Sequence, residues 1–335
     1  MWLTRLTGFA ALCNLLVEYL GYFFPAADEG AWRTVIVTAL VAAFAYVNVI
    51  GIRPTAVVNN LFTVAKLIPL ILLVGIGLFF VDPHGYSSAS SPTYSDFSTA
   101  VLLLVFAFSG FEVALIPAGE VMNPRRHMPF ALLTAIGVVA LLYVLIQVVS
   151  IGTLPGLAQS ERPLADAAEL FLGAAGASII TAGALVSITG TLNTGMLAAP
   201  RLLFAMAQQG QLPRVFAATH ERFHTPHVAI LMTAAVILVF SLQATFITAL
   251  KISTVIRLIT YAATCVALIK LRRDAAAGPA IFNAPGGVAV ALAATALCVW
   301  LLSNSTWDEA LLVGVAAAVG LFIHFAHRLL PSSRR

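Results

Sequence analysis

Residues 106–112 read F-A-F-S-G-F-E, and they place a carboxylate and a helix-weakening pair inside an otherwise apolar run. A carboxylate such as Glu112 at mid-membrane depth costs about 3 kcal/mol even on the most lenient insertion scale. Ser109 and Gly110 weaken the helical hydrogen-bond ladder, and a broken helix is tolerated in a bilayer only where it lines a cavity or is packed in protein. The stretch therefore predicts a broken membrane helix, with substrate passage as the working hypothesis.

Composition places the chain among integral membrane proteins. Of 335 residues, 60% are hydrophobic and 10% are charged, and the mean hydropathy is +0.97. These are more apolar residues than one soluble core can bury. Three cysteines, all in apolar runs, indicate neither a disulfide framework nor a metal site, and no loop carries a catalytic constellation. We therefore expect no metal, cofactor, nucleic-acid partner or enzymatic activity.

Apolar runs long enough to cross roughly 30 Å of hydrocarbon predict ten transmembrane helices and an all-α fold. No linker of domain size interrupts them, so residues 1–335 are expected to form a single transmembrane domain. The predicted spans are 6–24, 34–52, 60–81, 97–119, 129–153, 174–207, 227–243, 247–270, 284–303 and 309–330.

The lysines and arginines predict the orientation. Thirteen of the eighteen fall in loops on one side of the predicted spans, and only Arg33 and Arg162 fall on the other side. Cationic loops are retained in the cytoplasm. Both termini are therefore predicted to be cytoplasmic, in the plasma (cytoplasmic) membrane.

Four ordered segments carry a family resemblance. Residues 106–131, F-A-F-S-G-F-E-V-A-L-I-P-A-G-E-V-M-N-P-R-R-H-M-P-F-A, resemble the sixth helix and following loop of amino acid–polyamine–organocation permeases. Residues 49–66, 191–213 and 257–273 resemble this family's fourth-to-fifth helix junction, the end of its eighth helix and its tenth helix. The combination covers nearly the whole chain in the expected order.

The resemblance implies the LeuT-like architecture, in which two five-helix inverted repeats surround a substrate at the bilayer midplane. The ten spans then correspond to the family's helices three to twelve, so the bundle is expected to be incomplete at the N-terminus. The missing first helix supplies the glycine-rich break that holds a substrate carboxylate in the family. Half of the expected binding site is accordingly not encoded.

The broken helix supplies the predicted substrate-binding or gating residues. Phe106 and Phe108 are candidate aromatic gates, although as membrane-helix aromatics they equally fit packing against neighbours or lipid. Ser109 and Gly110 form the break. Glu112 matches an acidic position that couples substrate release to protonation in some relatives. Burial would raise the pKa of such a carboxylate toward neutrality, as a proton carrier requires. The alternative is a structural carboxylic acid that hydrogen-bonds the broken backbone.

A second group is predicted to serve proton or ion coupling. The resemblance to proton-coupled relatives places the Lys66 ammonium where sodium sits in ion-coupled ones. Ser187, Thr189 and Thr191 lie on the helix that would face it and offer hydroxyl oxygens. Lys66 can instead snorkel to the headgroups, and hydroxyl residues are common in membrane helix contacts.

Arg257 lies deep in the eighth predicted span and needs a partner or water. Glu18, near the outer end of the first span, is the carboxylate proposed to form an external gate with it.

Two functions remain open. The chain is either a secondary active transporter of amino acids or related amines, proton-coupled or exchanging, or a truncated, transport-incompetent relative or partner subunit. The sequence does not distinguish between substrates, between symport and exchange, or between oligomeric states.

Overall fold

The computed structural model describes residues 2–51, 56–86, 93–112, 123–160, 162–273, 286–307, 310–311, 314–315, 318 and 320–321. Helices dominate this part of the chain, and none of its residues lies in a strand. Its α-helices are α1 (Trp2–Leu20), α2 (Gly30–Ile50), α3 (Ala56–Gly77), α4 (Tyr94–Ala107), α5 (Pro124–Thr153), α6 (Pro163–Gln208), α7 (His227–Gln243), α8 (Phe246–Arg273) and α9 (Gly287–Ser303).

The first nine predicted spans each overlap one of these helices, which confirms an all-α polytopic membrane protein. Five helical segments in the described residues meet length and hydropathy criteria for crossing a membrane, and α4, α7 and α9 are shorter apolar helices. The predicted span 309–330 lies mostly outside the described residues, as does the second half of span 97–119.

Local sequence explains where several helices begin and end. A capping box starts α4, because the Thr93 hydroxyl accepts the backbone N–H of Asp96 and the Asp96 carboxylate accepts that of Thr93. Gly51 ends α2 in the left-handed conformation. Gly173, with φ of +67°, interrupts α6, so the segment after it begins where the span 174–207 was predicted.

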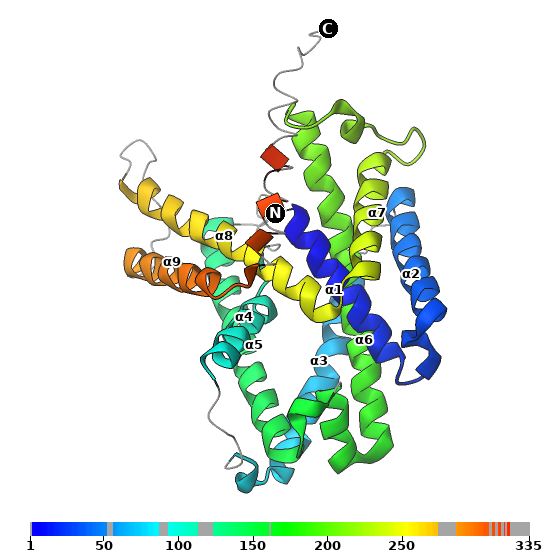
Figure 1. Ribbon diagram of the computed structural model, residues 1–335, viewed down its shortest axis with the longest axis vertical. Coiled ribbons are helices and arrows are strands. Elements are labelled where there is room, and N and C mark those ends of the chain that lie inside the picture. Colours follow the sequence, from blue (N-terminus) through cyan, green and yellow to red (C-terminus); the bar gives the residue numbers. More distant parts are fainter. Residues whose placement is uncertain are drawn as a thin grey trace.

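The main contacts among α1, α2, α3, α6, α7 and α8 follow a symmetric pattern, and Figure 1 shows α1, α2, α6 and α7 gathered on one side of the molecule. Helix α1 packs against α6 and α8, α3 packs against α6, and α2 packs against α7. Exchanging α1 with α6, α2 with α7 and α3 with α8 leaves this set of contacts unchanged. The α1–α8 contact becomes the α6–α3 contact, and the α1–α6 and α2–α7 contacts become themselves. Helices five apart run in opposite directions when consecutive spans alternate. The pattern is therefore that of an inverted repeat.

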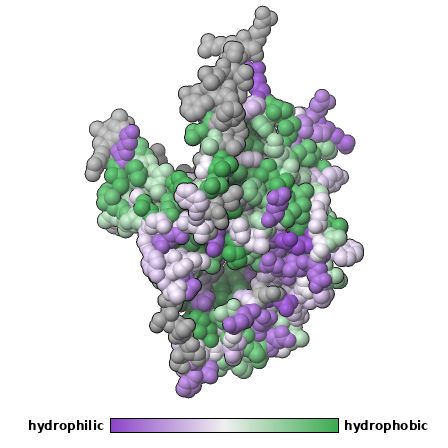
Figure 2. Space-filling view, viewed as in Figure 1, coloured by the Kyte–Doolittle hydropathy of each residue, from purple (hydrophilic) through white to green (hydrophobic). Residues whose placement is uncertain are grey.

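The buried core and the exposed surface are both apolar. Val17 and Val37 are fully buried between α1, α2, α6 and α7. On α5, Phe130 is 72% exposed and Leu133 is 65% exposed, and apolar residues cover much of the face in Figure 2. A water-soluble monomer rarely exposes such large apolar patches, whereas a lipid-facing surface requires them.

Close helix contacts depend on glycine at defined positions. Helix α3 carries a buried proline, Pro69, at its contact with α6. A Cβ at Gly183 would lie 2.5 Å from Cγ of that proline. The proline ring is rigid, so it cannot turn away to make room.

We expect Gly183→Ala to lower the free energy of unfolding by about 1–3 kcal/mol through overpacking. Gly137→Ala on α5 is the matched control, because a Cβ there meets nothing within 4 Å and alanine favours a helix by about 1 kcal/mol. Denaturation in detergent, followed by circular dichroism, measures both variants. Equal stability of the two variants would show that the α3–α6 contact tolerates a methyl group.

Candidate functional site

Helix α4 ends at Ala107, inside the apolar run, and the following backbone leaves helical geometry. Gly110 has φ of +105°, which residues with a Cβ rarely adopt. The helix break predicted at Ser109 and Gly110 is therefore confirmed. Residues 113–122, which continue the predicted span, lie outside the described residues.

Side chains satisfy the backbone carbonyls at this break. The Ser109 hydroxyl donates to the carbonyl of Phe106 at 2.6 Å. From α5, the Tyr143 hydroxyl donates to the carbonyl of Ala107 at 3.3 Å. Irregular backbone at membrane depth is stable only with such partners, because lipid offers none.

The Glu112 carboxylate joins the end of the break to α8. It forms an ion pair with Arg257 and accepts hydrogen bonds from the Tyr261 hydroxyl at 3.3 Å and from the Gly110 backbone N–H at 2.9 Å. The side chains of the pair are only 18% and 10% exposed, glutamate first. Charge-assisted hydrogen bonds in such a site are strong, so the pair holds α4 and α8 together.

This pairing changes the basis of the proton-carrier prediction. The prediction assumed an isolated buried carboxylate, which would favour its neutral form. Instead, Glu112 has a guanidinium partner and two further hydrogen-bond donors. Proton coupling through Glu112 stays a prediction.

The external gate between Arg257 and Glu18 was wrong, because the partner of Arg257 is Glu112. Helices α1 and α8 are antiparallel, and the hydroxyl of Ser253 donates to the carbonyl of Thr4 at 2.8 Å. Arg257 lies one turn after Ser253 on α8, so it lies beside the start of α1. Glu18 is fourteen residues along α1 from Thr4, roughly 20 Å.

A cavity of about 640 Å³ lies beside the break. Predicted site residues from four helices and the break share its wall. They are Lys66, Phe106, Ser109, Gly110, Glu112, Ser187, Thr191 and Arg257.

Three predicted residues are not among those that line the cavity. The Phe108 ring packs edge-on against Tyr143, with ring centroids 5.2 Å apart. Thr189 lies on α6 between lining residues, and Glu18 lies at the far end of α1.

The cavity wall also contains residues that sequence reasoning missed. Arg5, Gly8, Phe9 and Leu12 form an i, i+3, i+4, i+7 stripe on α1. From the sequence, Arg5 is only one of the thirteen cationic residues on the predicted cytoplasmic side. The stripe was visible in the sequence, but one helix alone does not reveal what its faces contact.

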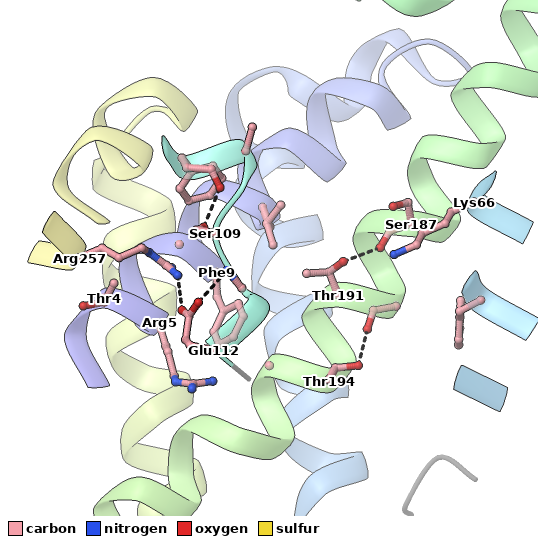
Figure 3. Close-up of a pocket in the computed structure, with 18 of the residues that line it drawn as sticks. Thr4, Arg5, Phe9, Lys66, Ser109, Glu112, Ser187, Thr191, Thr194 and Arg257 are labelled. Atoms are coloured by element: carbon pink, nitrogen blue, oxygen red, sulfur yellow. Dashed lines mark hydrogen bonds and ion pairs between the residues drawn. The ribbon is translucent and has the colours of Figure 1, made fainter. Parts of the chain in front are cut away.

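Figure 3 shows Lys66 and Ser187 on the opposite side of the cavity from Arg257 and Glu112. Lys66 is half-buried. The Thr191 hydroxyl donates to the carbonyl of Ser187 at 2.9 Å, within α6. The wall thus combines charged, hydroxyl and aromatic groups, as a site for a small polar molecule requires.

The sequence profile described as amino acid permease matches residues 1–322. The chain belongs to the amino acid permease family. Its profile covers the cavity, the broken helix and both partners of the Glu112–Arg257 pair. The chain is thus a member of a family of transporters rather than enzymes.

Characterised relatives carry transport names. The chain is 25% identical to the branched-chain amino acid permease BcaP of Bacillus subtilis (strain 168) over 311 residues, 90% of the chain and 66% of the relative. It is 28% identical to the serine/threonine exchanger SteT of the same organism, covering 82% and 64%. It is 32% identical to an arginine/ornithine antiporter of Pseudomonas aeruginosa, covering 63% and 46%. The chain therefore spans just under two thirds of the length of the first two relatives.

Removing the charge of Glu112 tests the role of the buried pair. We expect Glu112→Gln to lower the free energy of unfolding by about 3 kcal/mol, because it leaves the Arg257 guanidinium without an anion. The double variant Glu112→Gln/Arg257→Met should recover much of this loss. Denaturation in detergent measures all variants.

Asp28→Asn is the matched control, because it also removes a carboxylate that pairs with an arginine. Asp28 and its partner Arg33 are 45% and 30% exposed, so the loss should stay below about 1 kcal/mol. Equal losses at the two sites would contradict a structural role for the Glu112–Arg257 pair.

Proposed function

We propose that this chain carries out secondary active transport of amino acids or related amines across the membrane, by alternating access around α4. The observation that carries the proposal is the cavity beside a broken helix, with mixed polar and aromatic walls. Such sites at discontinuous helices are where transporters of this architecture bind substrate. The names of the characterised relatives support amino acids as the substrate class.

The proposed location is the plasma membrane, with both termini in the cytoplasm. The excess of lysine and arginine on one side of the predicted spans supports this orientation. Residues 1–335 are proposed to act as one transmembrane domain.

Transport is proposed to be proton-coupled or to proceed by exchange. Opening the Glu112–Arg257 pair would free the carboxylate to take up a proton, so proton binding and movement of α4 against α8 would be linked. The exchanger and antiporter among the relatives support the second mode. In either mode, we propose that Lys66 supplies the fixed cation that replaces sodium, with Ser187 and Thr191 beside it.

Reconstitution into liposomes tests transport and its coupling. We expect the purified chain to accumulate labelled amino acid when an inward proton gradient or internal amino acid is present. Glu112→Gln should abolish the response to the proton gradient, because the side chain no longer takes up a proton. Glu221→Gln is the control, since Glu221 is exposed in the loop after α6.

Absence of uptake by the chain would favour the alternative, a transport-incompetent relative or partner subunit. Co-expression with a candidate partner, followed by the same uptake measurement, would then separate those two forms of the alternative. Uptake whose proton response persists in Glu112→Gln would remove Glu112 from the coupling mechanism.

Lys66 and Lys270 make a second matched comparison. If the Lys66 ammonium replaces sodium, uptake should be independent of sodium, and Lys66→Met should reduce it at least about tenfold, or about 1.4 kcal/mol. Lys270→Met should have little effect, because Lys270 is exposed near the end of α8. Initial uptake rates with and without sodium measure both. Full activity of Lys66→Met would indicate that Lys66 only snorkels.

A further inference from the structure

The charges on the cavity wall are unequal. Among the described lining residues, Arg5, Lys66 and Arg257 are cationic, and Glu112 is the single anion. Charges in a membrane-embedded cavity are screened less than charges on a water-exposed surface. The described wall therefore favours a ligand that brings negative charge.

Arg5 is the cation best placed to receive it. Glu112 is already engaged by Arg257, Tyr261 and its own loop backbone. Arg5 interacts electrostatically with both Glu112 and Arg257, and Figure 3 shows Glu112 between the two arginines. Glu112 thus pairs with the guanidinium of Arg257 and lies near that of Arg5.

A second observation points to unused donor capacity in the same cluster. The Nε atom of Arg257 is buried and has no hydrogen-bond partner in the described structure. A buried donor without a partner is costly. A carboxylate from a ligand at this end of the cavity would add acceptor oxygens to a cluster of two guanidinium groups and one carboxylate.

The rest of the wall is suited to an uncharged side chain. Phe9, Leu12, Phe62 and Phe106 supply aromatic and aliphatic surface. A second ammonium or a guanidinium would meet three cations of like charge and one anion that is already paired. Like-charge contacts of this kind discriminate between ligands.

We propose that the cavity recognises its substrate by the carboxylate, through Arg5, and selects neutral and acidic amino acids over cationic amino acids and plain amines. This inference rests on the proposed transport function and specifies its substrate class. It sets the chain apart from the relative named for arginine and ornithine.

Matched ligands test the inference on the unmodified protein by direct binding in detergent. Leucine and 3-methylbutylamine differ only by the carboxylate, and glutamine and lysine differ mainly by side-chain charge. We expect leucine to bind at least about tenfold more tightly than the amine, and glutamine at least about tenfold more tightly than lysine. Equal or tighter binding of the amine or of lysine would overturn the inference while leaving transport intact.

Variants then assign the effect to one side chain. Arg5→Gln should weaken leucine binding about tenfold or more and reduce the difference between leucine and the amine, and Arg5→Lys should restore part of both. Arg214→Gln removes the same charge from an exposed position outside the cavity and should leave binding unchanged. Unchanged leucine binding in Arg5→Gln would overturn the assignment, whereas binding of no ligand by the unmodified protein would overturn the proposed function itself.

Discussion

The structure depends on how the backbone is satisfied where α4 stops inside the membrane. Lipid provides no hydrogen-bond partners, so each group freed by the break must find one in the protein. Ser109 and Tyr143 donate to the carbonyls at the end of α4. Glu112 accepts the Gly110 N–H and reaches α8 through Arg257. The break is thus held by α5 on one side and α8 on the other.

This arrangement gives one carboxylate two duties. As a structural group, Glu112 accepts donors from the break, Tyr261 and Arg257. As a cavity-lining group, it lies beside Arg5 and the proposed substrate position. Any event that neutralises the carboxylate or competes for Arg257 would also loosen α4 from α8. The proposed alternating access would use this link between the cavity and the two helices.

The sequence predicted the positions of the helices better than the contacts between them. Hydropathy located the spans because a bilayer demands long apolar helices, and Ser109 with Gly110 located the break because both weaken a helix. The external gate failed because distance along a span says nothing about which helix lies opposite. Arg257 lies deep in its predicted span, and α8 packs against α1 so that Arg257 meets the end of the break. Arg5 was missed for the same reason.

The sequence by itself determined the fold class, the positions of the first nine helices, the break in α4 and the family resemblance, since all of these follow from local composition and order. Only the tertiary structure decided that Glu112 pairs with Arg257, that Arg5 joins them, and that Lys66 lies across the same cavity. These contacts join residues up to about 250 positions apart. Their geometry is set by how antiparallel helices pack, which no single helix encodes.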